Sequence, residues 1–199
     1  IEQANHQVIL MENSYNLDLY KKRLRKYKHT GHVVGSIVMN CNPFTLGHRY
    51  LVEQACERSH WVHLFVVKED ASFFTFQDRY KLICEGLEDL QNLTIHEGSD
   101  YIISKATFPT YFIKDKRQID SLYTELDLNI FRNHLAPQLG ITHRYVGEEP
   151  LCAVTNEYNE QMKKSFHIAA HSALELSGFN HYVPMGKPLL MIGHPKHES

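Results

Sequence analysis

Apolar and polar positions along the chain follow two periodicities in turn, which predict alternating strands and helices. The apolar run from Trp61 to Val67 is typical of a strand buried on both faces, as in a parallel sheet. Apolar residues then recur at helical spacing from Phe76 to Leu90. The same patterns predict strands at residues 8–11, 37–39, 93–95 and 142–146, and helices at residues 17–28, 48–55, 119–135 and 154–162. The alternation predicts an α/β fold with a parallel sheet.

The junction between the strand at residues 37–39 and its following helix carries the most informative residues. It reads NPFTLGH over residues 42–48. Ligands of open α/β sheets bind beyond the carboxyl ends of the strands, and a helix N-terminus there attracts phosphate. Gly47 permits close approach of a bulky anion, while Thr45 and His48 can donate hydrogen bonds to it. An ordinary turn with His48 as a helix cap is the alternative.

Residues 101–116 place hydroxyls and a lysine among aromatic side chains. This mixture suits a pocket for a small anion or a pantetheine-like arm, formed by Ser104, Lys105 and Thr107. Lys114 is an alternative to Lys105 as the phosphate contact. A loop packed by its own aromatic side chains is the simpler interpretation.

Two further positions are candidates for nucleotide contact. Gly147 ends the strand at 142–146, where it permits close approach of a nucleotide, and Glu148 can accept from a ribose hydroxyl or help hold Mg²⁺. A strand-to-loop turn with solvated acids is the alternative. Arg79, near the start of a predicted helix, can reach a phosphate or form an ion pair on the helix surface.

Composition narrows the functional classes. The chain has 199 residues, 43% of them hydrophobic and 22% charged, with a formal net charge of −2. We therefore expect no general attraction to nucleic acid or anionic membranes, and no apolar run is long enough to span a bilayer. The sequence does not begin with Met, so we expect it to be a piece of a longer chain.

The basic, cysteine and histidine residues give weaker signals. We interpret the basic residues between Lys21 and Lys28 as a solvated helix face rather than a nucleic-acid site. None of the four cysteines forms a C-x-x-C pair, so zinc and redox motifs are not supported. Cys56 and Cys84 are expected in the core, whereas Cys41 could be exposed. The fourteen histidines lack metal-ligand spacing and are expected mostly at the surface.

The string at residues 42–48 resembles the (H/T)-x-G-H signature of the nucleotidyltransferase superfamily. Over roughly residues 17–162 the chain more narrowly resembles the citrate lyase ligases. The strings that carry this likeness are residues 34–55, Ser72-Phe73-Phe74, Ile102-Ile103-Ser104, Ala106-Thr107-Phe108-Pro109 and Val146-Gly147-Glu148-Glu149-Pro150.

The resemblance implies a Rossmann-like parallel sheet of the nucleotidyltransferase (HUP) type with flanking helices. Residues 1–33 would be the last strand of an upstream acetyltransferase-like domain and its connecting helix. Residues 34–165 would be the nucleotidyltransferase-like domain, and residues 166–199 a C-terminal segment of atypical sequence. The family's late I-S-x-S/T-x-x-R motif is missing there, because the last arginine is Arg144. Lys187 or Lys196 could supply a point charge instead.

The resemblance also implies an activity and its residues. A cytoplasmic ligase would use ATP and Mg²⁺ to activate acetate as acetyl-adenylate, then acetylate the prosthetic-group thiol of the citrate lyase acyl carrier subunit. His48 would act on the α-phosphoryl transition state, Thr45 on the phosphates and Glu148 on the ribose. The other residues expected to shape the nucleotide cleft are Met39, Asn40, Asn42, Phe44, Gly47 and Gly147.

Two alternatives remain at this point. The chain could be an adenylyltransferase acting on a phosphorylated acceptor, such as nicotinamide mononucleotide or phosphopantetheine. It could also be a catalytically impaired nucleotide-binding module, because the late arginine is missing.

Overall fold

A computed structural model describes residues 3–4, 9–12, 14–68, 73–109, 121–147, 157–162 and 190–193. Its centre is a five-stranded sheet in the order β5-β4-β3-β6-β7. The strands are β3 (Val34–Met39), β4 (Trp61–Val66), β5 (Leu93–Glu97), β6 (His143–Val146) and β7 (Leu190–Gly193). The first four strands are parallel, as predicted, and β7 adds an antiparallel edge beside β6. A short hairpin of β1 (Gln3–Ala4) and β2 (Ile9–Leu10) lies outside this sheet.

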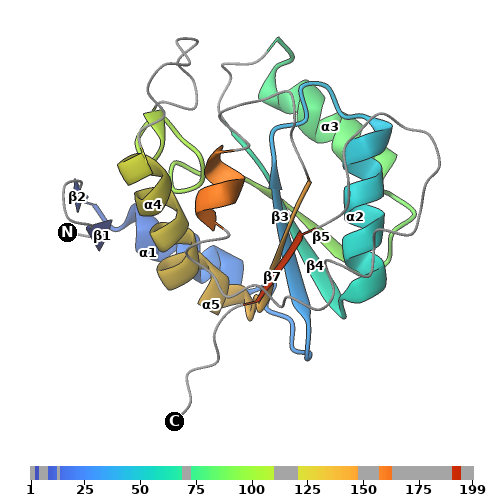
Figure 1. The fold of residues 1–199 in the computed structure, drawn as a ribbon, viewed down its shortest axis with the longest axis horizontal. Helices are drawn as coiled ribbons and strands as arrows, with labels where there is room; N and C mark the ends of the chain where they lie inside the picture. The colour runs from blue at the N-terminus through green and yellow to red at the C-terminus, as the bar shows by residue number, and fades with distance from the viewer. Residues whose placement is uncertain are drawn as a thin grey trace.

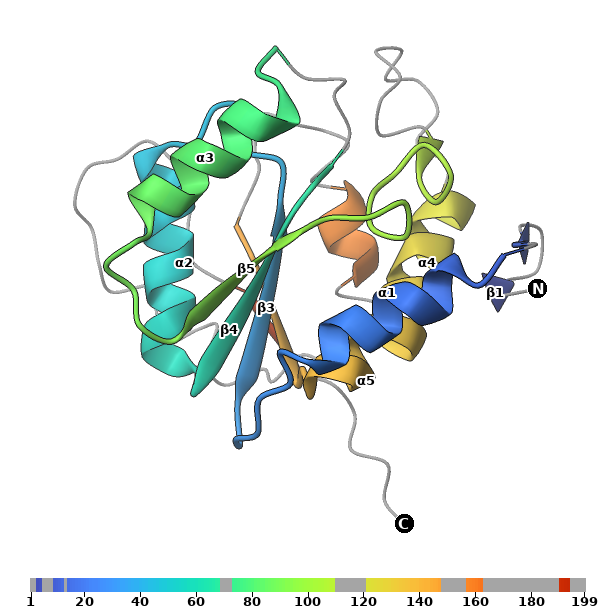
Figure 2. The same ribbon diagram turned by 180° about the vertical axis from the view of Figure 1, so that it is seen from behind.

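Helices cover both faces of the sheet (Figures 1 and 2). One face carries α2 (Leu46–Arg58) and α3 (Phe76–Gly86), and the other carries α1 (Asn16–Arg25), α4 (Ser121–Ile130) and α5 (Ala136–Leu139). The predicted α/β fold with flanking helices is confirmed. The proposed domain boundaries after residues 33 and 165 stay predictions.

The strand order places a topological switch beside the predicted phosphate corner. From β3 the chain proceeds outward through β4 and β5, then returns to add β6 on the other side of β3. Gly35 pairs with His143, and Ser36 with Arg144. A crevice at the carboxyl ends of two such strands is where doubly wound sheets bind ligands. The expected ligand site therefore lies above β3 and β6.

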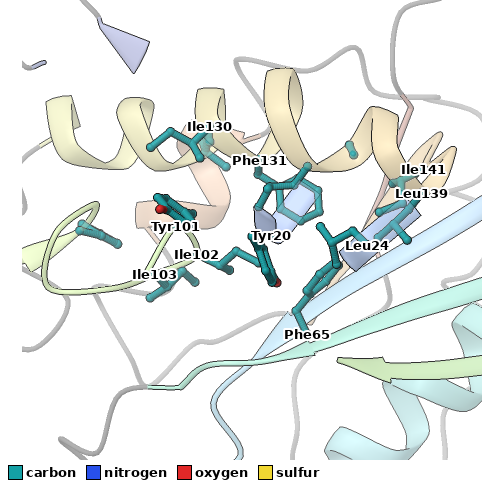
Figure 3. Packing of buried hydrophobic residues seen from close by; sticks show 14 of the residues in the cluster. Tyr20, Leu24, Phe65, Tyr101, Ile102, Ile103, Ile130, Phe131, Leu139 and Ile141 are labelled. Atoms are coloured by element: carbon teal, nitrogen blue, oxygen red, sulfur yellow. The ribbon is translucent and has the colours of Figure 1, made fainter. Parts of the chain in front are cut away.

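The core on the α1 side is formed by parts of the chain that are far apart in sequence (Figure 3). Tyr20 and Leu24 from α1 pack with Phe65 of β4 and Phe131 of the segment after α4. The loop after β5 adds Tyr101 and two isoleucines to the same cluster. This packing fixes α1 against the ends of β4 and β5.

The helical region after residue 119 ends differently from the prediction. A π-helical turn at Phe131–Leu135 connects α4 to α5, and Pro137 lies in the first turn of α5 instead of ending the helix. Proline fits there because the first helical N–H groups have no partner within the helix. Gly140, with φ 74°, ends the helix, as predicted.

One expectation about burial is wrong, and two histidines are exceptions to the expected surface location. Cys41, the second residue after β3, is only 2% exposed, because its φ of 53° turns it into the core under α2 and α3. His63 and His96 lie inside the sheet, where Nδ1 of His63 is 2.9 Å from Nε2 of His96. Burial lowers the pKa of His63 to about 3 and that of His96 to about 4. As expected, Cys56 is buried and Cys84 is partly buried.

Within the described ranges, no helix is long and apolar enough to cross a membrane.

Candidate functional site

The predicted phosphate corner lies between β3 and α2 and is organised by Thr45 and His48. Thr45 is the N-cap of α2, and its backbone N–H donates to Nδ1 of His48 at 3.1 Å. The Thr45 hydroxyl lies 2.8 Å from the same nitrogen. The Phe44 ring lies nearly parallel to the imidazole, at an interplanar angle of 21°. His48 is thus a helix cap, as the simpler interpretation predicted, yet only one of its two ring nitrogens is used.

These contacts determine where His48 carries its proton. Because Nδ1 accepts a backbone N–H, the proton of the neutral ring lies on Nε2. Burial lowers the pKa of His48, which keeps the ring neutral near pH 7. In the part of the chain that the structure describes, Nε2 of His48 has no hydrogen-bond partner. The corner therefore offers a neutral donor beside the N-terminus of α2, where phosphate is favoured.

Arg79 stabilises this corner through hydrogen bonds to the backbone next to it. The side chain is fully buried, so the alternative of a surface ion pair is wrong. Its guanidinium donates to the carbonyls of Asn40 at 2.7 Å, Val67 at 3.0 Å and Phe74 at 3.2 Å. It also bonds Oδ1 of Asn40 at 2.9 Å. Arg79 thereby ties the carboxyl ends of β3 and β4 to the segment before α3, while its contact with phosphate stays a prediction.

The other corner residues lie close by. Asn42 accepts the backbone N–H of Phe74 at 3.1 Å, which links the turn to the entry of α3. Met39 is buried at the end of β3, and Gly47 is half-buried in the first turn of α2. Their contact with a nucleotide stays a prediction.

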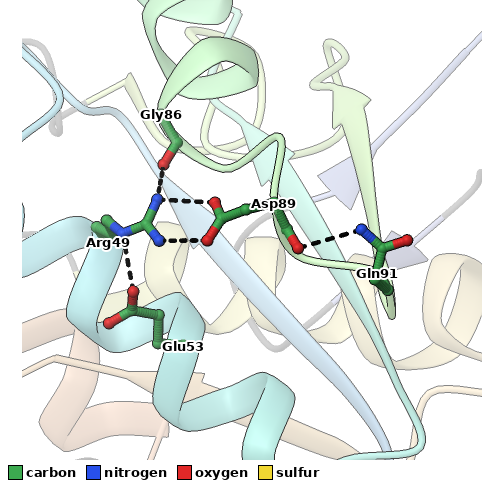
Figure 4. Close-up of polar contacts among 5 residues, drawn as sticks. All are labelled: Arg49, Glu53, Gly86, Asp89 and Gln91. Atoms are coloured by element: carbon green, nitrogen blue, oxygen red, sulfur yellow. Dashed lines mark hydrogen bonds and ion pairs between the residues drawn. The ribbon is translucent and has the colours of Figure 1, made fainter.

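Arg49, the residue after His48, anchors α2 to α3 (Figure 4). It bonds Glu53 at 2.8 Å, both carboxylate oxygens of Asp89 at 2.9 and 2.6 Å, and the carbonyl of Gly86. The Arg49 bond lowers the pKa of Asp89. The sequence shows the i,i+4 spacing of Arg49 and Glu53, but nothing in it reveals Asp89 as a partner.

Gly147 follows directly after the end of β6, on the other side of the switch point. Its carbonyl accepts the side-chain amide of Asn159 at 3.0 Å, which attaches the helical residues 157–162 to the strand end. A Cβ built on Gly147 would lie 3.7 Å from Leu51 of α2, an ordinary contact distance. Gly147 and α2 are therefore neighbours, as expected. Glu148 lies outside the described residues.

The predicted anion pocket around residues 104–107 has its hydroxyls engaged within the protein. Ser104 and Thr107 are buried, whereas Lys105 is exposed. The Ser104 hydroxyl donates to the carbonyl of Asp100 at 2.6 Å, and the Thr107 hydroxyl donates to Asp127 at 2.8 Å. Anion binding by these residues stays a prediction, as does that by Lys114, which lies outside the described residues.

Sequence reasoning missed the buried charge cluster centred on Asp127. One carboxylate oxygen accepts from Thr107 and from the N–H of Ile103 at 2.7 Å, and the other accepts from the Tyr158 hydroxyl at 2.8 Å. Arg144 donates to that hydroxyl at 3.2 Å. Burial raises the pKa of Asp127. The available signal was an acid within the apolar stretch at residues 126–131 and an arginine inside a predicted strand.

The cluster joins the loop after β5 to the helical residues that support Gly147. Arg144 lies with its guanidinium carbon 4.6 Å from the centroid of the Phe131 ring, and its Nε and Nη1 have no hydrogen-bond partner among the residues that the structure describes. Among the described residues, no group of three or more histidine, cysteine or acidic side chains is arranged to hold a metal ion.

Comparison with known proteins relates this chain to one family. The sequence profile of the citrate lyase ligase C-terminal domain matches residues 34–179. The chain is 55% identical over 157 residues to the [citrate [pro-3S]-lyase] ligase of Escherichia coli (strain K12), which covers 78% of this chain and 45% of that protein. It is 53% identical over 164 residues to the Klebsiella pneumoniae protein of the same name, covering 82% of this chain and 48% of that protein.

The chain also has a more distant relative among the adenylyltransferases. The chain is 24% identical over 111 residues to the phosphopantetheine adenylyltransferase of Streptococcus sanguinis (strain SK36), covering 53% of this chain and 68% of that protein. The chain spans about half the length of the curated ligases it matches.

Proposed function

The chain belongs to the citrate lyase ligase C-terminal domain family, and we propose that it catalyses ATP-dependent activation of acetate followed by transfer of the acetyl group to a thiol. The family resemblance read from the sequence is thereby confirmed. Because the chain spans about half of its ligase relatives, the complete reaction and its partners belong to the proposal.

The observation that carries the proposal is the hydrogen bonding of His48. Its Nδ1 accepts from Thr45, so its Nε2–H is the donor at the N-terminus of α2. In the first step, an acetate oxygen attacks the α-phosphorus of ATP, and the bond to pyrophosphate breaks. Negative charge builds on the non-bridging oxygens during this displacement. A neutral imidazole donor placed there stabilises that charge without deprotonation, and loss of one such donor typically costs about 10²–10³-fold in rate.

The surrounding residues have supporting roles in this proposal. The Thr45 hydroxyl and the backbone at Gly47 bind the phosphates, and the corner residues Met39, Asn40, Asn42 and Phe44 with Gly147 form the nucleotide cleft. Glu148 contacts the ribose. Arg79 is a positioning residue, because it holds both the carbonyl and the side chain of Asn40. Mg²⁺ bound to the phosphates would neutralise their charge.

In the second step the thiol sulfur attacks the acetyl carbonyl carbon. The bond to AMP breaks, the thiol proton leaves to solvent, and a thioester forms. We propose the citrate lyase acyl carrier as the thiol partner, on the strength of the names of the ligase relatives. We propose a cytoplasmic setting and no nucleic-acid partner.

Acetate-dependent exchange of labelled pyrophosphate into ATP tests the first step. We expect exchange that requires acetate and that falls about 10²–10³-fold in His48→Ala. Unchanged exchange in that variant would remove His48 from the chemistry.

A second candidate is adenylyl transfer to a phosphorylated acceptor, which the likeness to a phosphopantetheine adenylyltransferase favours. Exchange that is driven by phosphopantetheine and not by acetate would favour this candidate. ATP binding without any exchange would instead indicate an impaired nucleotide-binding module.

A further inference from the structure

A cavity of about 530 Å³ lies between α1 and the carboxyl ends of β4 and β5. It lies one strand away from the phosphate corner. Helix α1, which lines it, is on the opposite side of the sheet from α2 (Figure 2). Its volume is in the range of small-molecule sites, and its position follows the rule for ligands of parallel sheets. The proposed roles of the corner residues do not use this cavity.

Positive charge dominates the cavity lining. Its charged side chains are Lys22, Arg23, Lys26 and Lys68, with Glu97 and Asp100 opposing them. Within the described ranges, none of the four basic side chains forms an ion pair within 4 Å. This local excess of positive charge occurs in a chain whose formal net charge is −2.

The neighbouring Lys21, on the same helix, has its charge neutralised by an ion pair. It does not line the cavity, and its Nζ lies 2.9 Å from the carboxylate of Asp18. Among the described residues, the cations of α1 that line the cavity form no such ion pair. Because unpaired charges around a concave wall focus the electric field, the cavity favours an anion. The basic face of α1 is solvated, as we interpreted it, but part of it also lines this cavity.

The rest of the lining suits an extended organic group rather than a bare ion. Tyr20 and Tyr101 form part of the wall, with ring centroids 6.1 Å apart (Figure 3). At Gly98 a Cβ would lie 2.4 Å from the carbonyl oxygen of Val66 and 3.1 Å from the backbone nitrogen of Lys68. The chain therefore turns tightly against the end of β4, and this turn shapes the cavity beside Lys68.

Backbone contacts connect the cavity to the phosphate corner. Lys68 follows Val67, whose N–H donates to the carbonyl of Met39 at 3.0 Å. The Val67 carbonyl accepts from Arg79, which also bonds Asn40. A ligand held at Lys68 thus lies beside the strand ends that lead to His48.

We propose that this cavity binds the phosphate-bearing portion of the thiol substrate and thereby directs the thiol toward the acyl-adenylate. The inference rests on the proposed function. The basic side chains bind the phosphate, and the tyrosine wall packs along the arm. Phosphate on a carrier-attached arm and phosphate on a free thiol have the same chemistry, so the test includes both.

The test compares acetylation of 4′-phosphopantetheine and pantetheine, two thiols that differ in the terminal phosphate. We expect the wild-type chain to have the lower KM for the phosphorylated thiol. Lys26→Glu and Lys68→Glu should each raise that KM about tenfold or more, the usual effect of losing a bond between charged groups. The KM for pantetheine and the acetate-dependent pyrophosphate exchange should not change.

Lys81→Glu is the matched control, because Lys81 is an exposed lysine on α3 outside the cavity and undergoes the same charge reversal. It should behave as wild type. Equal KM values for the two thiols in the wild-type chain, or an equal effect of Lys81→Glu, would overturn the cavity proposal while acetate-dependent exchange still supported the proposed function.

If exchange is absent, calorimetric binding of phosphopantetheine to the same variants still tests the cavity. Loss of binding in Lys26→Glu and Lys68→Glu alone supports it, and equal binding overturns it. Where exchange is present, carrier acetylation identifies the source of the phosphate. A parallel loss of carrier acetylation in the two variants assigns the phosphate to the carrier's arm, and a loss confined to the free thiol assigns it to the free form.

Discussion

Replacing Tyr158 by phenylalanine removes one oxygen atom from the centre of the buried charge cluster. That hydroxyl donates to Asp127 at 2.8 Å and accepts from Arg144 at 3.2 Å. All three side chains are at most 5% exposed, so water cannot replace the lost contacts. Hydrogen bonds to charged groups contribute about 1.5–3 kcal/mol each, and the two share one atom, so we expect a loss of about 3 kcal/mol of unfolding free energy.

Urea unfolding of wild type and variant measures this loss, and Tyr145→Phe is the matched control. Tyr145 is also fully buried, but its hydroxyl pairs with the neutral Ser59 hydroxyl at 2.9 Å. Its removal should cost about 1 kcal/mol. If Tyr158→Phe costs no more than Tyr145→Phe, the hydroxyl does not bridge two charges and the account of the cluster is wrong.

The pH dependence of the same variant gives an independent check. Burial raises the pKa of Asp127, so this group's contribution to stability is full below the unfolded pKa of about 4 and is lost as pH rises through the folded value. The Tyr158 hydroxyl donates to the ionised carboxylate, and that contribution matters most at high pH. The cost of Tyr158→Phe should therefore be larger at pH 8 than at pH 5. A cost independent of pH would contradict a charged Asp127.

Three further predictions follow from the structure. Gly98→Ala should lower the melting temperature, because its Cβ would lie 2.4 Å from a backbone oxygen of β4, whereas Gly147→Ala, with 3.7 Å to its nearest neighbour, should not. Burial lowers the pKa of His63 to about 3 and that of His96 to about 4, so both stabilise the fold above pH 6.5 and lose that contribution as pH falls through those values. Urea unfolding should therefore show an unfolding free energy that falls between pH 6 and pH 4, by up to about 3 kcal/mol per pH unit. The lowered pKa of His48 predicts that the acid limb of the pH–rate profile for acetate-dependent exchange has its midpoint below pH 6.5, the ordinary value for histidine.

Local chemistry accounts for what could be predicted from the sequence. The apolar run at residues 61–67 identified β4, because strands buried on both faces are apolar throughout. The corner at Thr45 and His48 was predictable because the strand end, the cap and the ring nitrogen lie within a few residues of one another. The sequence could also place Gly147 at a strand end, because the residues that precede it were predicted to form a strand.

Features that depend on distant partners could not be predicted. Tyr158 lies 31 residues from Asp127 in the chain, and the burial of Arg79 depends on carbonyls from β3 and β4. The same is true of the cavity, because α1 meets the end of β5 only in the folded chain. Residue preferences alone also did not show that Pro137 would lie in the first turn of helix α5 instead of ending the helix.

The most direct test of the central claim is a crystal structure of the chain bound to a non-hydrolysable ATP analogue. We expect phosphates at the N-terminus of α2, with an α-phosphate oxygen about 2.7–3.2 Å from Nε2 of His48 and the Thr45 contact to Nδ1 retained. A nucleotide bound elsewhere, or an imidazole whose Nε2 bonds a protein acceptor instead, would contradict it.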